Sequence, residues 1–182
     1  MKQWTAAVVA AAVLHGAAAP RADGADGRAH TRLLDHGRIA AAFELALARS
    51  AAFRAIVDSI DETDTFVVIE DGACPGHEVR SCLHLLPATS TAYRAVRIHV
   101  GGRQRQLEIV AELAHELRHA VEIAAHPEVT DAEHLRAMYR AIGYQSCSTY
   151  QTECWETREA QAAERLVSEQ IRRFQAFTAT RP

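Results

Sequence analysis

Residues 104–125 constrain the fold more than any other stretch, because their side chains separate by polarity at the period of a helix. Apolar residues at spacings of three and four form a core stripe, namely Leu107, Val110, Ala114, Leu117, Val121 and Ala124. The other side carries Glu108, Glu112, His115, His119, Glu122 and His126. Pro127 ends the pattern. We therefore expect one helix with an apolar core side and a polar side.

The polar side contains the motif His115-Glu116-Leu117-Arg118-His119, of the form H-E-x-x-H. Residues four apart on a helix lie one above the other, about 6 Å between their Cβ atoms. His115 and His119 can therefore bind one zinc ion, with Glu116 beside them as the base that takes a proton from the attacking water. The alternative is a solvated charged face with two incidental histidines.

A catalytic zinc site needs a third protein ligand and an open position. Residues 155–174 have a helical pattern with an apolar stripe of Ala160, Ala163, Val167, Ile171 and Phe174. Extending this stripe backwards by four residues reaches Glu156, whose carboxylate would need a positive partner there. Glu159, one step round the helix, is the second candidate, and both could also be surface glutamates.

Two stretches, LAHELRHAVEIA at 113–124 and WETREAQAAERLV at 155–167, resemble a family of uncharacterised exported bacterial zincin-like proteins. In that family an HELxHAxE helix is followed by an aromatic-Glu-Thr-x-x-Ala helix. The stretch AAFRAIVDSIDETDTFVVIE at 51–70 is similar to the helix and strand that precede the motif there.

These proteins resemble the gluzincins, peptidases whose third zinc ligand is a glutamate on a later helix. The resemblance implies His115, His119 and Glu156 as zinc ligands and Glu116 as the general base. The chain departs from the family's pattern in the Cys147–Cys154 segment just before the Glu-Thr.

The remaining patterns predict a small domain of helices and strands. We expect two helices over 38–60 with Ser50 as the N-cap between them, strands at 65–70, 81–86 and 93–100, and a helix over 131–142. The expected fold is α+β and zincin-like, with a small, mostly antiparallel sheet packed on the H-E-x-x-H helix and a C-terminal helix supplying the third ligand. Strand 93–100 could pair with an extended peptide substrate.

The N-terminus has the pattern of a secretory signal peptide. Lys2 precedes an apolar run at 4–14, followed by small residues, and the run is too short to span a membrane. We expect a signal peptide over 1–19, a flexible leader over 20–37 and a single domain over 38–182. The alternative is an alanine-rich helix of the mature domain.

The four cysteines form two close pairs, Cys74 with Cys82 and Cys147 with Cys154. Behind a signal peptide this spacing predicts two local disulfides and a periplasmic or secreted location. A structural zinc site made of the four thiolates is the alternative, although the tight Cys-x-x-Cys pairs of such sites are missing.

The formal net charge of −3 and a pI near 6.4 argue against nucleic-acid binding. We therefore expect an exported zinc-dependent hydrolase, specifically a metallopeptidase acting on peptide or other amide substrates, without a stable membrane span. The alternatives are an exported metal-binding or scaffold protein with little or no turnover, and a binding module for a protein partner.

Several further polar residues are candidates for supporting roles. Glu112 and Glu122 lie three residues from a histidine of the motif, where either could accept a hydrogen bond from a ligand imidazole. The sequence does not choose among the side chains that could stabilise an oxyanion, which are His126, His134, Tyr139, Tyr144, Tyr150 and Arg158.

Overall fold

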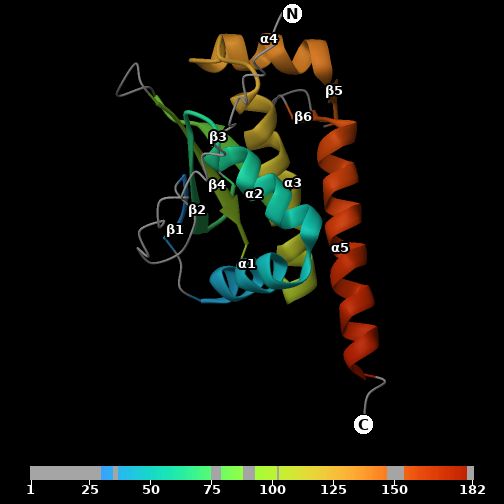
Figure 1. Ribbon diagram of the computed structural model, residues 1–182. Helices are drawn as coiled ribbons and strands as arrows, with labels where there is room; N and C mark the ends of the chain where they lie inside the picture. The colour runs from blue at the N-terminus through green and yellow to red at the C-terminus, as the bar shows by residue number, and fades with distance from the viewer. Residues whose placement is uncertain are drawn as a thin grey trace, which may run out of the picture.

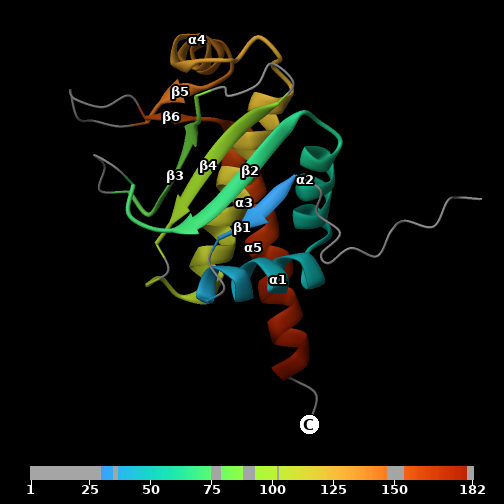
Figure 2. The same ribbon diagram turned by 90° about the vertical axis from the view of Figure 1, so that its left-hand side faces the viewer.

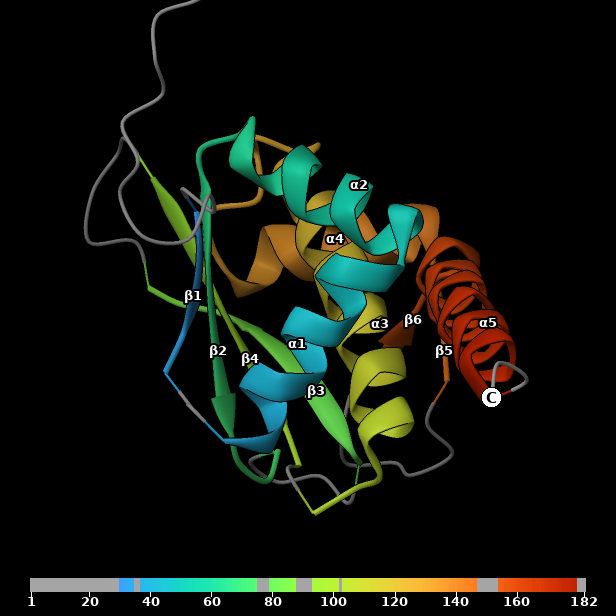
Figure 3. The ribbon, with the colours of Figure 1, turned by 60° about the horizontal axis from the view of Figure 1, so that its bottom comes forward.

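The computed structural model describes residues 30–34, 37–74, 79–87, 93–101, 103–146 and 154–179. The helices are α1 (Arg38–Arg49), α2 (Ala51–Asp61), α3 (Gln106–Ala124), α4 (Ala132–Ile142) and α5 (Arg158–Ala179). The strands are β1 (Thr31–Leu33), β2 (Thr65–Asp71), β3 (Ser81–Leu85), β4 (Arg94–Val100), β5 (Tyr144–Gln145) and β6 (Trp155–Glu156). The fold is α+β: the main sheet lies on one side of α3, and α5 lies on the other (Figures 1 and 3).

The main sheet is mixed, with the strand order β1-β2-β4-β3 (Figure 2). Strand β2 pairs in parallel with β1 and with β4, and only β3 runs antiparallel to β4. The prediction of a mostly antiparallel sheet is therefore wrong. The helices α1 and α2 provide the crossover that parallel pairing of β1 and β2 requires. Alternation of polar and apolar residues locates a strand but does not give its direction, so the sequence pattern could not show this.

Strand β1 lies within the range assigned to a flexible leader, residues 20–37. Its three residues pair with β2 in the register Thr31↔Val67 to Leu33↔Ile69, so this part of the assignment is wrong. The strand is too short for its polarity pattern to stand out in the sequence.

Strand β4 lies inside the sheet, between β2 and β3. Its Val96, Ile98 and Val100 are fully buried against the helices, and the predicted strand over 93–100 is confirmed. Because both edges of β4 are already paired, an extended peptide cannot add to it, and that expectation is wrong. The strand at this edge of the sheet is β3.

The break between α1 and α2 lies at Ser50, as predicted. Its hydroxyl oxygen accepts a hydrogen bond from the backbone N–H of Phe53 at 3.0 Å, which caps α2. The same hydroxyl donates to Gln170 Oε1 of α5 at 2.6 Å. One buried serine therefore starts α2 and ties α5 to it.

Helix α3 is buried on more sides than its pattern predicts. Its fully buried apolar residues are Ile109, Val110, Leu113, Ala114, Leu117, Ala120 and Ile123. The predicted stripe residues Leu107, Val121 and Ala124 are only half-buried. On the polar side Glu116, His119 and Glu122 are also buried, because α3 lies between the sheet and α5 (Figure 3).

The C-terminal end of α3 is held by Arg94 at the start of β4. Its guanidinium donates to the carbonyls of Ile123 and His126, each at 2.7 Å, and to that of Ala124 at 3.1 Å. It also pairs with Asp64 at 2.5 Å. These bonds satisfy the carbonyls that a helix end leaves without partners and fix α3 relative to the sheet.

Helix α5 begins at Arg158, three residues later than predicted, and Trp155–Glu156 form β6, which pairs with β5. The Thr157 hydroxyl accepts the N–H of Ala160 at 3.0 Å, as an N-cap does. Glu156 therefore lies on a short strand before the helix, and the assignment of this residue to the C-terminal helix is wrong.

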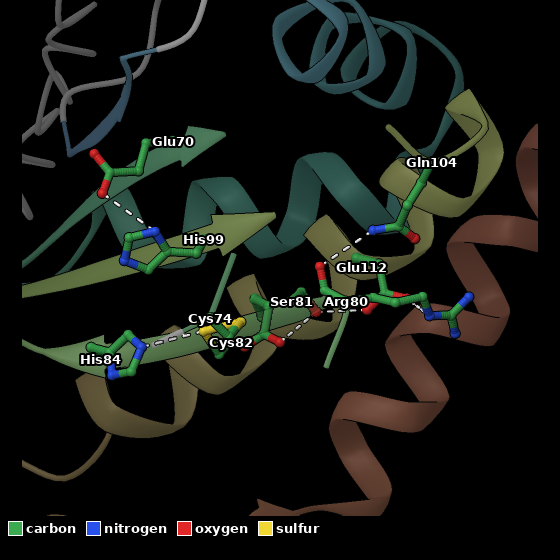
Figure 4. Close-up of a disulfide and its surroundings, with 10 residues drawn as sticks. Glu70, Cys74, Arg80, Ser81, Cys82, His84, His99, Gln104 and Glu112 are labelled. Atoms are coloured by element: carbon green, nitrogen blue, oxygen red, sulfur yellow. Dashed lines mark hydrogen bonds and ion pairs between the residues drawn. A yellow bond between two sulfur atoms is a disulfide. The ribbon is translucent and has the colours of Figure 1, made fainter. Parts of the chain in front are cut away.

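Cys74 and Cys82 form a disulfide, as predicted, with their Cα atoms 5.9 Å apart (Figure 4). These two cysteines therefore cannot act as thiolate ligands of a four-cysteine zinc site. Cys147 lies outside the described residues, and with it the predicted Cys147–Cys154 bridge. A disulfide is consistent with an extracellular location. Within the described part of the chain, none of the helices is long and apolar enough to cross a bilayer.

Candidate metal centre

Three side chains from two segments form a group that could hold a metal ion: His115 and His119 of α3, and Glu156 of β6. One ligand atom from each lies within 4.8 Å of the others. His115 Nε2 is 3.4 Å from Glu156 Oε2, and His119 Nε2 is 3.6 Å from Glu156 Oε1. Glu159, the second candidate, is exposed in the first turn of α5.

These separations fit a bound cation better than direct hydrogen bonds. A good N–H···O bond is about 2.7–3.2 Å long. By contrast, ligands at about 2.0–2.1 Å from a tetrahedral zinc ion are about 3.3–3.4 Å apart. The two Nε2 atoms lie 3.4 and 3.6 Å from different oxygens of Glu156, and the three side chains together are close enough to hold one metal ion.

The second ring nitrogen of each histidine contacts a carboxylate. His119 Nδ1 lies 2.8 Å from Glu122 Oε2, and His115 Nδ1 lies 3.3 Å from Glu164 Oε2. Because an ionised carboxylate only accepts, each Nδ1 carries the hydrogen, and in the neutral ring Nε2 then presents its lone pair to the site. Such outer carboxylates orient the histidines of metal sites.

Of the two predicted partners, Glu112 and Glu122, Glu122 has this role, and Glu164 was not predicted. Glu164 lies four residues after Ala160 and three before Val167, within the apolar stripe of α5. A carboxylate in a buried stripe needs a polar or positive partner. The position of Glu164 on this stripe is the sequence signal that could have pointed to it.

The neighbouring charged groups shift the pKa values of His119 and Glu156. Burial alone would lower the pKa of His119, but Glu122 and Glu156 outweigh it and raise the pKa to about 9. Burial would raise the pKa of Glu156, but His119 and His115 outweigh it and hold the pKa below its usual value. The raised pKa favours the positively charged ring of His119, which has a hydrogen on both nitrogens, and a metal ion can bind only after Nε2 loses its hydrogen.

Glu116 is 5% exposed and faces β3. Its Oε1 lies 2.7 Å from the Ser81 hydroxyl, which also lies 2.6 Å from Glu112 Oε2. Burial raises the pKa of Glu116, against the opposing influence of His119 and His115. The carboxyl therefore exchanges its proton closer to neutral pH than an exposed glutamate does.

Glu112, the other sequence candidate for an outer ligand partner, does not contact either histidine among the described interactions. It pairs with Arg80 at 3.1 Å and accepts from Ser81 (Figure 4). A hydroxyl has one hydrogen, so Ser81 can donate to only one of its two carboxyl partners at a time. The carboxyls of Glu112 and Glu116 therefore share the one hydrogen of Ser81. Ser81 was not predicted, because no sequence motif near it marks it as a partner of Glu116.

The site opens into a cleft of about 900 Å³ between β3, α3, α4, the β5–β6 hairpin and α5. Of the oxyanion candidates, only Tyr139 lines this cleft among the described residues. It is 6% exposed, and its ring packs edge-on against His119 with 5.5 Å between centroids. Burial, and then the Glu122, Glu116 and Glu156 carboxylates, raise the pKa of Tyr139, so its hydroxyl keeps its hydrogen.

The other oxyanion candidates lie elsewhere. His126 and His134 pair with Glu128 and Asp131, each at 2.9 Å. Tyr144 accepts a hydrogen bond from Gln161 at 2.7 Å, and Arg158 is exposed. Tyr150 lies outside the described residues.

No protein-family model matches this chain, and comparisons with curated proteins and with solved structures found no match. The zincin-like and gluzincin-like resemblance therefore remains a prediction carried by its sequence motifs. The geometry of the site is the basis for assigning a function.

Proposed function

We propose that this chain is an exported zinc-dependent hydrolase, a metallopeptidase that holds zinc through His115, His119 and Glu156. One observation carries the proposal. Both histidine Nε2 atoms face the Glu156 carboxylate, at 3.4 and 3.6 Å from its two oxygens, while both Nδ1 atoms contact carboxylates. The Cys74–Cys82 disulfide supports export.

Glu116 is the proposed general base. When bound, zinc polarises a substrate carbonyl and acidifies a water molecule in its open position. The Glu116 carboxylate accepts the proton of the attacking water and passes it to the leaving amine. The Ser81 hydroxyl fixes the Oε1 atom of Glu116, and the Tyr139 hydroxyl donates to the carbonyl oxygen as negative charge develops on it.

The open edge of β3 supports an extended polypeptide as the substrate. The N–H of Gly101 donates to the Arg80 carbonyl, and the N–H of Leu86 donates to the Ala95 carbonyl. In an antiparallel pair the hydrogen-bonded positions alternate, so Ser81, Leu83 and Leu85 direct their backbone groups away from β4. This edge pairs with no other strand among the described residues, and β3 lines the cleft.

The test starts with the zinc content of the protein purified from the periplasm, with His119→Ala as the matched loss of a ligand. We expect about one zinc per chain in the wild type and little in the variant. Hydrolysis is then measured on a mixture of quenched fluorescent peptides, with and without a chelator. A wild-type protein without zinc contradicts the proposal, and a zinc-loaded protein that cleaves no peptide or amide supports the metal-binding scaffold instead.

The identity of the third ligand is tested by zinc titrations of Glu156→Ala and Glu159→Ala. Loss of a direct ligand should weaken binding by more than the roughly 10–100-fold typical of an outer partner. Glu159→Ala should bind zinc like the wild type, because Glu159 is exposed on α5. If Glu159→Ala is the more damaging change, the ligand assignment is wrong although the hydrolase proposal survives.

A further inference from the structure

We infer that Thr157 is the positioning residue of the metal centre, because it orients two of the three proposed ligands. It contacts Glu156 directly and His119 through Glu122. The inference rests on the proposed function and assigns a role to the threonine that follows Glu156. Thr157 itself is not one of the proposed ligands.

Thr157 is fully buried between β6 and α5. Its hydroxyl lies 2.7 Å from Glu122 Oε1, and the other oxygen of that carboxylate, Oε2, lies 2.8 Å from His119 Nδ1. Its backbone N–H donates to Glu156 Oε1 at 2.8 Å, and this is the oxygen that faces His119 Nε2. Thr157 therefore contacts one ligand, Glu156, directly and a second ligand, His119, through Glu122, and these two ligands belong to different segments.

The direction of these bonds follows from donor and acceptor chemistry. The Thr157 oxygen already accepts the N–H of Ala160, and an ionised Glu122 can only accept, so the hydroxyl hydrogen points to Glu122. The Nδ1–H of His119 then donates a hydrogen bond to Glu122 Oε2. The lone pair of the neutral His119 ring is thereby directed at Glu156, as a metal ligand requires.

The hydroxyl also competes with a charged neighbour. Arg118 Nε lies 3.9 Å from the same Glu122 oxygen that accepts from Thr157. Without the hydroxyl, the guanidinium can draw this carboxylate toward the half-exposed surface and away from His119. The threonine therefore keeps Glu122 in line with the imidazole.

The experiment compares three single variants of the full chain. Thr157→Val keeps the shape and removes the hydroxyl, Thr157→Ser restores it, and Thr178→Val is the matched control. Thr178 lies near the end of α5, the helix that Thr157 caps; it is exposed, and among the described residues its hydroxyl bonds to carbonyls of its own helix. Zinc affinity is measured by competition with a chelator on folded protein.

We expect Thr157→Val to weaken zinc binding by about 10–100-fold, the effect typical of an outer partner of a metal ligand. Thr157→Ser should restore an affinity close to that of the wild type, and Thr178→Val should leave it unchanged. Thr157→Val also removes the cap of α5, so its unfolding midpoint is recorded without metal. A variant with a lower midpoint but wild-type zinc affinity shows a capping role alone and overturns the inference.

A double-variant cycle tests whether the effect passes through Glu122. Glu122→Gln removes the charge and also weakens zinc binding, and adding Thr157→Val to it should weaken binding little further. Fully additive losses overturn the inference, because they mean that Thr157 acts independently of Glu122. A wild-type protein that binds no zinc overturns the proposed function and this inference together, whereas zinc binding that Thr157→Val leaves unchanged overturns only the inference.

Discussion

Helix α3 buries two sets of residues, and different interactions hold them. The first set, called here the apolar side, consists of fully buried apolar residues of the core such as Leu113 and Ile123. The second set, called here the polar side, consists of Glu116, His119 and Glu122, each 5–7% exposed, and Glu116 of this set contacts Ser81 of β3. An apolar contact needs only matching volume, whereas a buried polar group needs a partner of the right chemistry. The apolar side therefore determines stability, and the polar side determines what the site can bind.

The largest expected effect comes from the polar side. Glu116→Gln should lower kcat/KM by about 10²–10⁴-fold, because the amide cannot act as a general base. Zinc content should stay at the wild-type level, because Glu116 is not a proposed ligand. Glu169→Gln, which alters an exposed glutamate of α5, is the control. A Glu116→Gln variant with full activity would show that the proposed mechanism is wrong.

A change on the apolar side should lower stability and leave zinc binding nearly unchanged. Leu113→Ala should lower the free energy of unfolding by about 2–5 kcal/mol, because it leaves a cavity in the core. The zinc affinity of the folded protein should change little. Chemical denaturation and a zinc titration measure the two effects, with the half-exposed Leu166→Ala as the control. If Leu113→Ala weakens zinc binding as strongly as a change at Glu122, the two sides of α3 are not separable.

The smallest expected effect is on stability, and it concerns the pair of Arg94 and Asp64 at the C-terminal end of α3. The Arg94 guanidinium holds the pKa of Asp64 below its usual value of 3.8. The unfolded chain then binds this proton more readily than the folded one, so the pair stabilises the fold above about pH 4 and the stabilisation disappears as the pH falls below that. Asp64 is half-exposed, so the contribution is about 1 kcal/mol or less.

Asp64→Asn should therefore lower the free energy of unfolding slightly at neutral pH and flatten its decline between about pH 5 and 3. Denaturation curves at several pH values measure this difference. Asp58→Asn, at an exposed position of α2, is the matched control. An unchanged pH dependence in Asp64→Asn would mean that Arg94 holds α3 through its carbonyl contacts alone.

The sequence predicts well those features that depend on neighbouring residues. The H-E-x-x-H histidines lie on one helix four residues apart, and the Ser50 cap and the buried residues of β4 also follow from local patterns. Contacts between distant segments could not be predicted in this way. Ser81 lies 35 residues before Glu116, and Thr157 lies 35 residues after Glu122, and no local pattern links either pair.

Glu156 shows how a helical pattern can mislead at its boundary. The apolar stripe of α5, extended backwards by four residues, reaches Glu156. The helix itself begins only after the Thr157 cap, so Glu156 lies in β6 and not in the helix. It nevertheless lies beside both histidines, because a residue just before a helix still lies close to that helix's first turn. Strand directions were unpredictable for another reason: they depend on how the chain crosses the sheet, which polarity patterns do not record.

His119 and Glu156 lie on either side of a long segment that contains α4 and β5. A cation bound by both residues would bind the folded chain and not the unfolded one, so it would stabilise the closed arrangement of this segment. The cleft wall formed by α4 would then resist proteases in the loaded protein. Chelation would expose this wall to cleavage while the core between α3 and the sheet stays folded.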